Sequence, residues 1–157
     1  MADKKLSWCF KLKDGLSFVE PNSRLAKSYL TEAKSSLARA EKNFADKDLL
    51  WTTVVIYYAE YYALYSFLQK IGIKCENHFC SILAVTLLLG EEKTVRINEH
   101  KDRRIDAQYY MRVGQEVQIR QMLQEAKLFV SFFEETTLNL TPEEIENFRK
   151  IIKRLIS

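Results

Sequence analysis

Glycine and proline are scarce in this chain, which has four glycines and two prolines among 157 residues. Because tight turns depend on these two residues, the composition disfavours all-β architectures with many turns. Long hydrophobic runs are missing too: none reaches the roughly 18 apolar residues that suggest a membrane span. The first residues, MADKKLSWCFKLKDGL, lack the apolar run of a signal peptide. We therefore expect a cytoplasmic protein with no membrane segment.

The chain also has little excess of one charge over the other, and few cysteines. The chain has 24 basic and 21 acidic residues and a net charge of +3, so any role with nucleic acid must depend on a local site. The three cysteines, Cys9, Cys75 and Cys80, form an odd set that argues against a disulfide scaffold. Cys75, His78 and Cys80 lie close together, but a structural zinc site needs a second ligand pair. We expect thiols here, and neither a metal nor another cofactor.

Common catalytic motifs are absent as well. There is no glycine-rich phosphate loop, no H-E-x-x-H and no G-x-S-x-G. The only two histidines are His78 and His100. Few acid–base sites can therefore be built from this chain.

Tyrosine, in contrast, is concentrated in residues 51–72. This segment holds five of the eight tyrosines: Tyr57, Tyr58, Tyr61, Tyr62 and Tyr65. Apolar residues cover most of the remaining helix surface, which predicts a helix inside a bundle rather than on its surface. A buried tyrosine hydroxyl needs a hydrogen-bond partner, so we expect a polar site beside this helix. Glu60, the only charged residue in mid-helix, must reach solvent, a basic partner or that site.

Apolar stripes and capping signals predict five helices with short connections. The expected helices cover residues 22–45, 48–70, 77–90, 114–137 and 141–155. Residues 1–21 contain an Asp14-Gly15 turn signal and predict a short extended arm or weak hairpin. The charged run 91–104 predicts a solvated loop, or a loop with one polar helical turn, that leaves His100 in solvent. The fold class is thus all-α: an N-terminal arm, 1–21, and an antiparallel up-and-down bundle of four to five helices, 22–157.

Candidate contact residues cluster in the segment Arg103 to Tyr110. Arginine offers a planar fork for phosphate and tyrosine a stacking face for a base. Arg104 and Tyr109 lie about 140° apart on a helix, so they could line two sides of one groove. In the alternative, which composition alone favours, Arg104 pairs with Asp106, Glu60 or a backbone carbonyl and Tyr109 fills the core. His78, just after a helix start at Asn77, could bond a tyrosine hydroxyl or face a ligand.

Taken together, these motifs resemble the HEPN domain family (higher eukaryotes and prokaryotes nucleotide-binding). VVIYYAEYYALYSFLQKIGIKCENH resembles the family's second helix, with its leucine-x-x-x-glycine turn and following histidine, here His78. RIDAQYY resembles the R-x-x-A-D-Y stretch and matches it at Arg104, Ala107 and Tyr109, with Gln108 in place of the acidic residue. GQEVQIRQMLQEAKLFVSFFEE resembles the last core helix, and the likeness covers about residues 23–135.

The resemblance implies a helical bundle that forms a two-fold dimer. Many HEPN proteins are metal-independent ribonucleases of toxin–antitoxin and defence systems, with an R-x(4–6)-H active site shared between subunits. Others are partners of minimal nucleotidyltransferases. Here no histidine follows Arg104 at that spacing, and the Arg96–His100 spacing is one residue short.

Three hypotheses follow. In the first, the chain is a non-catalytic module that binds nucleotide or RNA through Arg104, Tyr109, His78 and Arg103, as a homodimer with a nucleotidyltransferase-type partner. In the second, it is a metal-independent endoribonuclease toxin that uses Arg104 and Tyr109. In the third, it is a helical scaffold whose tyrosines only pack.

Overall fold

The computed structural model describes residues 2–157 and shows an all-α protein, as predicted. Within these residues it has seven α-helices, six of them in residues 22–157, where four to five were expected. The helices are α1 (Ala2–Lys11), α2 (Ser23–Ala45), α3 (Leu49–Ile71), α4 (His78–Leu89), α5 (Val95–Tyr110), α6 (Glu116–Leu138) and α7 (Pro142–Ile156). Between them lie a 3₁₀ turn, η1 (Glu91–Lys93), and two short strands, β1 (Ser17–Phe18) and β2 (Ile73–Lys74). The strands pair antiparallel, with Ser17 opposite Lys74.

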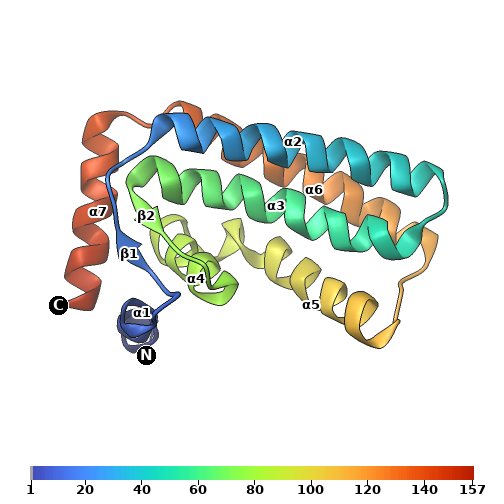
Figure 1. The fold of residues 1–157 in the computed structure, drawn as a ribbon, viewed down its shortest axis with the longest axis horizontal. Coiled ribbons are helices and arrows are strands. Elements are labelled where there is room, and N and C mark those ends of the chain that lie inside the picture. The colour runs from blue at the N-terminus through green and yellow to red at the C-terminus, as the bar shows by residue number, and fades with distance from the viewer. Residues whose placement is uncertain (1) are drawn as a thin grey trace.

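Three long helices, α2, α3 and α6, lie side by side along the molecule, and α5 runs along one side of α3 (Figure 1). Helix α7 crosses one end, where α1 and the two strands also lie. Both termini are at this end (Figure 1). Helix α3 is therefore the centre of the fold, in contact with α2, α4, α5, α6 and α7.

The tyrosine-rich helix is buried as predicted, and its most buried hydroxyls have partners. The Tyr57 hydroxyl lies 2.8 Å from Nδ1 of His78, and the Tyr61 hydroxyl lies 2.9 Å from Oγ of Ser81. The Tyr65 hydroxyl accepts a hydrogen bond from a backbone N–H in the loop before α4. These bonds remove the desolvation penalty that an unpaired buried hydroxyl would carry.

Local capping chemistry sets the helix ends where the sequence predicts them. The side chains of Asn22 and Asn77 each accept a hydrogen bond from a first-turn N–H, of Leu25 and Cys80 respectively. Thr141 and Glu144 form a reciprocal capping box at the start of α7. Helix α3 ends at Gly72, which adopts a left-handed conformation with φ +81°.

Residues 1–21 do not form the extended arm or weak hairpin that we predicted. Residues Ala2–Lys11 form α1, and the chain is extended only around β1. Leu6 and Cys9, three positions apart, face inward and are fully buried in the main core. This helical spacing was concealed by a short polar-apolar alternation that also fits a strand.

The charged run 91–104 is mostly helical, contrary to the loop expected from its composition. Its buried positions on α5 are Ile97, His100, Arg104 and Ala107, spaced three, four and three residues apart. This is a helical stripe in which two of the four members are ionisable. A search for apolar periodicity alone does not detect it.

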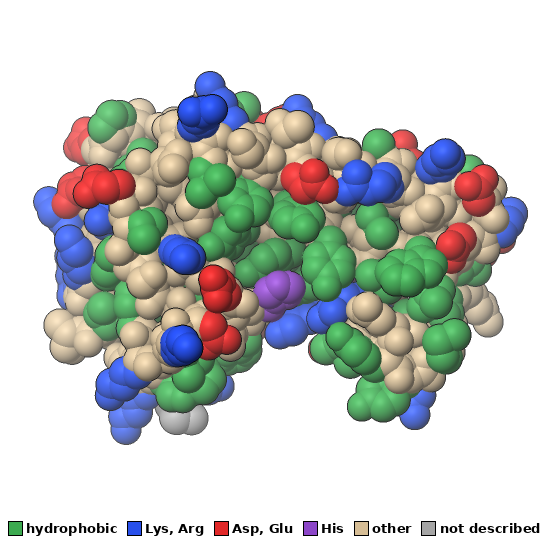
Figure 2. Space-filling model, in the orientation of Figure 1, with side chains coloured by type: hydrophobic (Ala, Val, Ile, Leu, Met, Phe, Trp, Pro, Cys, Tyr) green, Lys and Arg blue, Asp and Glu red, His purple; other side chains and the backbone are tan. Residues whose placement is uncertain are grey.

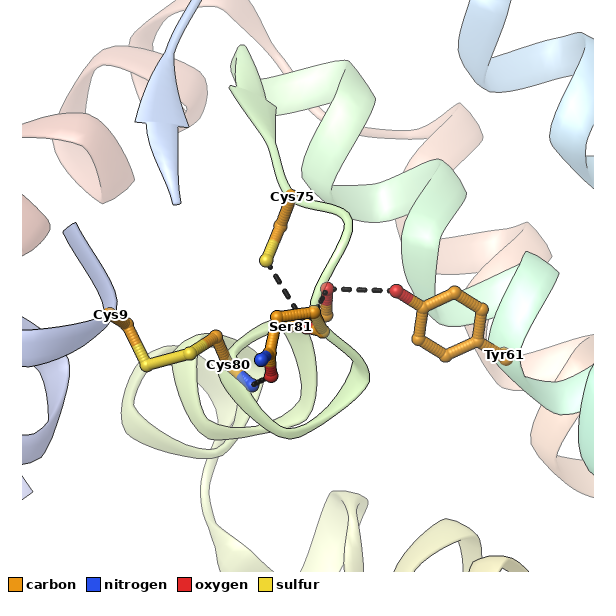
Figure 3. Close-up of a disulfide and its surroundings, with 6 residues drawn as sticks. Cys9, Tyr61, Cys75, Cys80 and Ser81 are labelled. Atoms are coloured by element: carbon orange, nitrogen blue, oxygen red, sulfur yellow. Dashed lines mark hydrogen bonds between the residues drawn. A yellow bond between two sulfur atoms is a disulfide. The ribbon is translucent and has the colours of Figure 1, made fainter. Parts of the chain in front are cut away.

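The expectation of unpaired thiols holds only for Cys75. A disulfide joins Cys9 of α1 to Cys80 of α4 (Figure 3). Cys75 is free and buried, and its Sγ donates to the backbone oxygen of Asn77 at 3.2 Å. Burial raises the pKa of this thiol. An odd cysteine count thus argued wrongly against a disulfide, because one pair and one leftover thiol also make three.

Candidate functional site

Arg104 is the centre of the candidate site. It projects from α5 toward α3, where its guanidinium carbon lies 4.9 Å from the ring centroid of Tyr57 and 5.7 Å from that of Tyr58. Such distances fit cation–π contacts. One guanidinium nitrogen donates to Oε1 of Gln108 at 3.2 Å. Only 9 % of the residue is exposed.

This buried cation has no acidic partner within residues 2–157. None of the ion pairs there involves Arg104, and its Nε has no hydrogen-bond acceptor. The alternative in which it pairs with Asp106, Glu60 or a backbone carbonyl is therefore wrong. A buried charge without a counterion is costly, and cation–π contacts offset only part of that cost. The arrangement leaves binding capacity for an anion.

His78 lies beside Arg104 and is held by two tyrosines. Its Nδ1 is within hydrogen-bond distance of the Tyr57 hydroxyl, and its ring stacks on Tyr61 with centroids 3.9 Å apart. Burial, together with the charges of Arg104 and Lys101, lowers the pKa of His78 to about 4. The imidazole is neutral near pH 7, so it can offer a hydrogen bond but no charge.

Tyr109 does not fill the core, contrary to the packing alternative. The residue is 66 % exposed at the end of α5. Its ring centroid lies 6.0 Å from the Arg104 guanidinium, at the outer limit of a cation–π contact. An exposed aromatic ring beside a cation is a suitable surface for stacking a base.

Arg103 is separated from this group. It is exposed and lines a cavity of about 480 Å³ between α5 and α6, which Arg104, Tyr109 and His78 do not line. The structure therefore brings together three of the four predicted contact residues, Arg104, Tyr109 and His78, and places Arg103 elsewhere.

The molecular surface is hollowed at the lower edge of the view in Figure 2. On the face shown, a histidine lies at its edge, with hydrophobic side chains above and Lys or Arg side chains below (Figure 2). Of the two histidines, His78 is partly exposed and His100 is buried. We call the set Arg104, Tyr57, Tyr58, His78 and Tyr109 the Arg104 site.

We predicted from the sequence that His100 lies in solvent, and this is wrong. The residue packs against α3 and is only 2 % exposed. Its Nδ1 lies 2.7 Å from Oε1 of Glu60, which is fully buried. Burial opposes protonation of His100, but the hydrogen bond and charge of Glu60, together with the charge of Glu125, outweigh it and raise the pKa. Burial also raises the pKa of Glu60. The pair therefore holds a proton to higher pH than its separate groups would.

The Glu60–His100 pair borders the cavity between α5 and α6. His100 lines this cavity, and its Nε2 lies 3.5 Å from Oε1 of Glu125. The other oxygen of Glu125, Oε2, lies 2.7 Å from Nε of Arg96, and both residues line the cavity. Sequence reasoning missed this network, although two signals pointed to it: the isolated charge of Glu60 and the helical i, i+4 spacing of Arg96 and His100.

Comparison with known proteins gives no relative: no family model, no curated protein and no solved structure matches the chain. Among residues 2–157, no helix is both long and apolar enough to cross a membrane. Those residues also contain no cluster of three or more His, Cys, Asp or Glu side chains that could hold a metal ion. The fold and the two polar sites on α5 are therefore the basis for a functional proposal.

Proposed function

We propose that this protein is a HEPN-like binding module for nucleotide or RNA. The observation that carries the proposal is Arg104: an arginine that is nine-tenths buried and has no counterion among residues 2–157, beside exposed Tyr109 and neutral His78. Phosphate suits the guanidinium fork, and a base suits the tyrosine face. His78 adds a hydrogen bond to a phosphate or sugar oxygen.

Binding without catalysis is the better fit for the Arg104 site. Cleavage of RNA through its 2′-hydroxyl needs one group that accepts a proton and one that donates a proton near pH 7. Burial raises the pKa of Tyr57 and Tyr61, so neither hydroxyl ionises readily. His78 has a pKa of about 4, so near pH 7 it is a neutral imidazole with a proton on only one of its two ring nitrogens. It is therefore not the protonated imidazolium that would act as the acid. The site can hold a phosphate but lacks an acid–base pair.

The proposal includes a homodimer in the cytoplasm and a separate nucleotidyltransferase-type partner, as in toxin–antitoxin pairs. These parts come from the resemblance in the tyrosine helix and in RIDAQYY. Exposed apolar side chains near the end of α5, Tyr110 and Met111 among them, leave surface available for a partner. Size-exclusion chromatography with light scattering tests the dimer directly.

Titration calorimetry with nucleoside mono- and triphosphates tests the binding function. Arg104→Met keeps an unbranched apolar side chain and removes the guanidinium and its charge, so we expect it to weaken binding about tenfold or more, as for loss of a charged hydrogen bond. Arg103→Met is the matched control, since that residue lines the cavity between α5 and α6 and lies outside the Arg104 site, and it should bind like the wild type. The proposal fails if the wild-type protein binds no nucleotide or RNA, or if both variants bind equally well.

A second candidate, endoribonuclease, is supported by the Glu60–His100 pair and Arg96 rather than by Arg104 and Tyr109. A histidine oriented by a buried carboxylate on an open cavity is an arrangement suited to general acid–base catalysis. Its test is cleavage of RNA in EDTA by wild type and by His100→Asn, with His78→Asn as control. Cleavage lost only in His100→Asn would favour this candidate, and no cleavage by the wild type would exclude it.

A further inference from the structure

A row of partly exposed tyrosines continues from the Arg104 site across α3 to α2. We call it the tyrosine row: Tyr58, Tyr62 and Tyr29, each neither fully buried nor fully exposed. The guanidinium of Arg104 lies 5.7 Å from the Tyr58 ring centroid. The next centroid distances are 6.4 Å from Tyr58 to Tyr62 and 6.1 Å from Tyr62 to Tyr29.

A second layer of tyrosines lies beneath the row and fixes it in place. Tyr57, Tyr61 and Tyr65 are buried, and each hydroxyl has a hydrogen-bond partner. Tyr65 packs edge-on against Tyr29 at 4.9 Å, and Tyr57 against Tyr58 at 5.6 Å. Rings supported in this way lose little further freedom when a ligand stacks on them, which favours binding.

The spacing of the row indicates the kind of strand that fits it. In a duplex, successive nucleotides of one strand rise by about 3.4 Å. The ring centroids are 6.1–6.4 Å apart, so bases stacked one per ring would belong to an extended strand whose own stacking is broken. Aromatic side chains bind single strands in this manner because every base has a π-face.

Charge is concentrated at one end of the row. Arg104 and partly buried Lys101 lie at the end near His78, and both charges act on that histidine. Farther along the row, near Tyr62, Arg39 is neutralised by Glu32 at 2.7 Å. The row therefore has one strong contact for phosphate, followed by a largely uncharged aromatic surface.

We infer that the ligand of this face is a single-stranded oligonucleotide of about three or four nucleotides rather than a free nucleotide. One phosphate binds Arg104, and successive bases stack along Tyr58, Tyr62 and Tyr29. This inference rests on the proposed nucleotide-binding function and extends the same site. Because few phosphates are neutralised, the affinity depends weakly on salt: the slope of log K against log salt is about −0.7 for each phosphate bound.

Fluorescence anisotropy with labelled 2′-O-methyl oligouridylates of two, four and eight nucleotides tests the inference. These probes cannot be cleaved through the 2′-hydroxyl, so turnover does not disturb the titration. We expect the affinity to rise at least tenfold from uridine monophosphate, measured by competition, to the four-nucleotide probe. From four to eight nucleotides it rises little, because the row ends at Tyr29.

Tyr62→Leu keeps an apolar side chain and removes the ring. We expect it to weaken binding of the four-nucleotide probe about tenfold while leaving uridine monophosphate unaffected, in line with the loss of one base–aromatic stack. Tyr62→Phe should bind like the wild type. Tyr110→Leu is the matched control, since that tyrosine is exposed and lies outside the row. Melting temperatures of all variants, measured first, show which of them are folded.

The outcomes separate this inference from the proposed function. If uridine monophosphate binds but affinity does not grow with length, the inference is overturned and the nucleotide site stands. Equal losses in Tyr62→Leu and Tyr110→Leu also overturn it. If neither monophosphate nor oligonucleotide binds, the proposed function fails and the inference fails with it.

Discussion

Ionisable side chains between α3 and α5 distinguish this bundle from a purely apolar one. Arg104 contacts Tyr57, and one turn away His100 contacts Glu60. The two histidines near this interface have opposite pKa shifts: burial lowers that of His78, and carboxylates raise that of His100. Their contributions to stability therefore depend on pH with opposite signs.

Comparing variants by urea unfolding between pH 4 and pH 8 tests this opposition. His78 has a pKa of about 4 in the folded state and about 6.5 when unfolded, so the unfolded chain binds more protons between these values. The wild type should therefore lose stability relative to His78→Asn as pH falls from about 6.5 to 4. An unfolding difference that stays constant over this range would contradict the shift.

His100 supplies the control of opposite sign in the same experiment. Its raised pKa means that its pairing with Glu60 and Glu125 stabilises the fold fully below about pH 6.5. That advantage over His100→Asn should shrink as pH rises through the folded-state pKa. Parallel profiles for the two variants would show that at least one of the two histidines lacks the environment described.

At the level of elements, the junction of α3, β1 and α7 depends on one close approach. Gly72 ends α3 with φ +81°, and a Cβ at this position would collide with the guanidinium of Arg149 and the backbone of Val19 and Pro21. One nitrogen of Arg149 donates to the carbonyl oxygens of Val19, Ile71 and Gly72 at 2.9–3.0 Å. Arg149, in the middle of α7, thus satisfies the end of a different helix.

Gly72→Ala should lower the free energy of unfolding by about 2 kcal/mol or more. The left-handed conformation alone costs an L-residue roughly 1–2 kcal/mol, and displacing Arg149 adds to this. Gly114→Ala is the control, because its closest neighbour is the end of a flexible glutamine side chain and its φ is not positive. Equal effects of the two substitutions in urea titrations would refute the role given to Gly72.

The fold could be predicted where local chemistry decides the structure. Asn22, Asn77 and Thr141 begin helices, and Gly72 ends one, because caps satisfy backbone groups within a single turn. Helix α5 was missed because a tertiary contact stabilises it: Glu60, forty residues earlier, neutralises His100. Neither residue shows this partner in its local sequence.

The candidate site was predictable to a similar extent. Arg104, Tyr109 and His78 were identified from residue type and order, and the structure places them together. The sequence could not show that Arg104 lacks a counterion, since Asp106 and Glu60 were equally plausible partners. It also could not separate Arg103 from Arg104. Adjacent residues of a helix point about 100° apart, but the sequence predicted a loop for this segment, so this angle could not be applied.

At the level of the whole molecule, the disulfide sets how firmly the N-terminal helix is held. Cys9 and Cys80 are 71 residues apart, so the bond closes a loop of nearly half the chain between α1 and α4. Reducing compartments keep most thiols unpaired. If the protein is cytoplasmic as proposed, α1 must rely there on noncovalent contacts with α4 and α7, chiefly through buried Leu6.

Removing the disulfide should therefore cost about 4 kcal/mol of stability, the loop-closure value for this separation. Cys9→Ala/Cys80→Ala and the reduced wild type should unfold at similar urea concentrations, both below the oxidised wild type. Cys75→Ser, which leaves the pair intact, should retain the response to reductant. An oxidised wild type no more stable than the reduced form would show that α1 is held by packing alone.

Because the Arg104 site lies on α3, α4 and α5, nucleotide binding should persist in the reduced protein at temperatures where it stays folded.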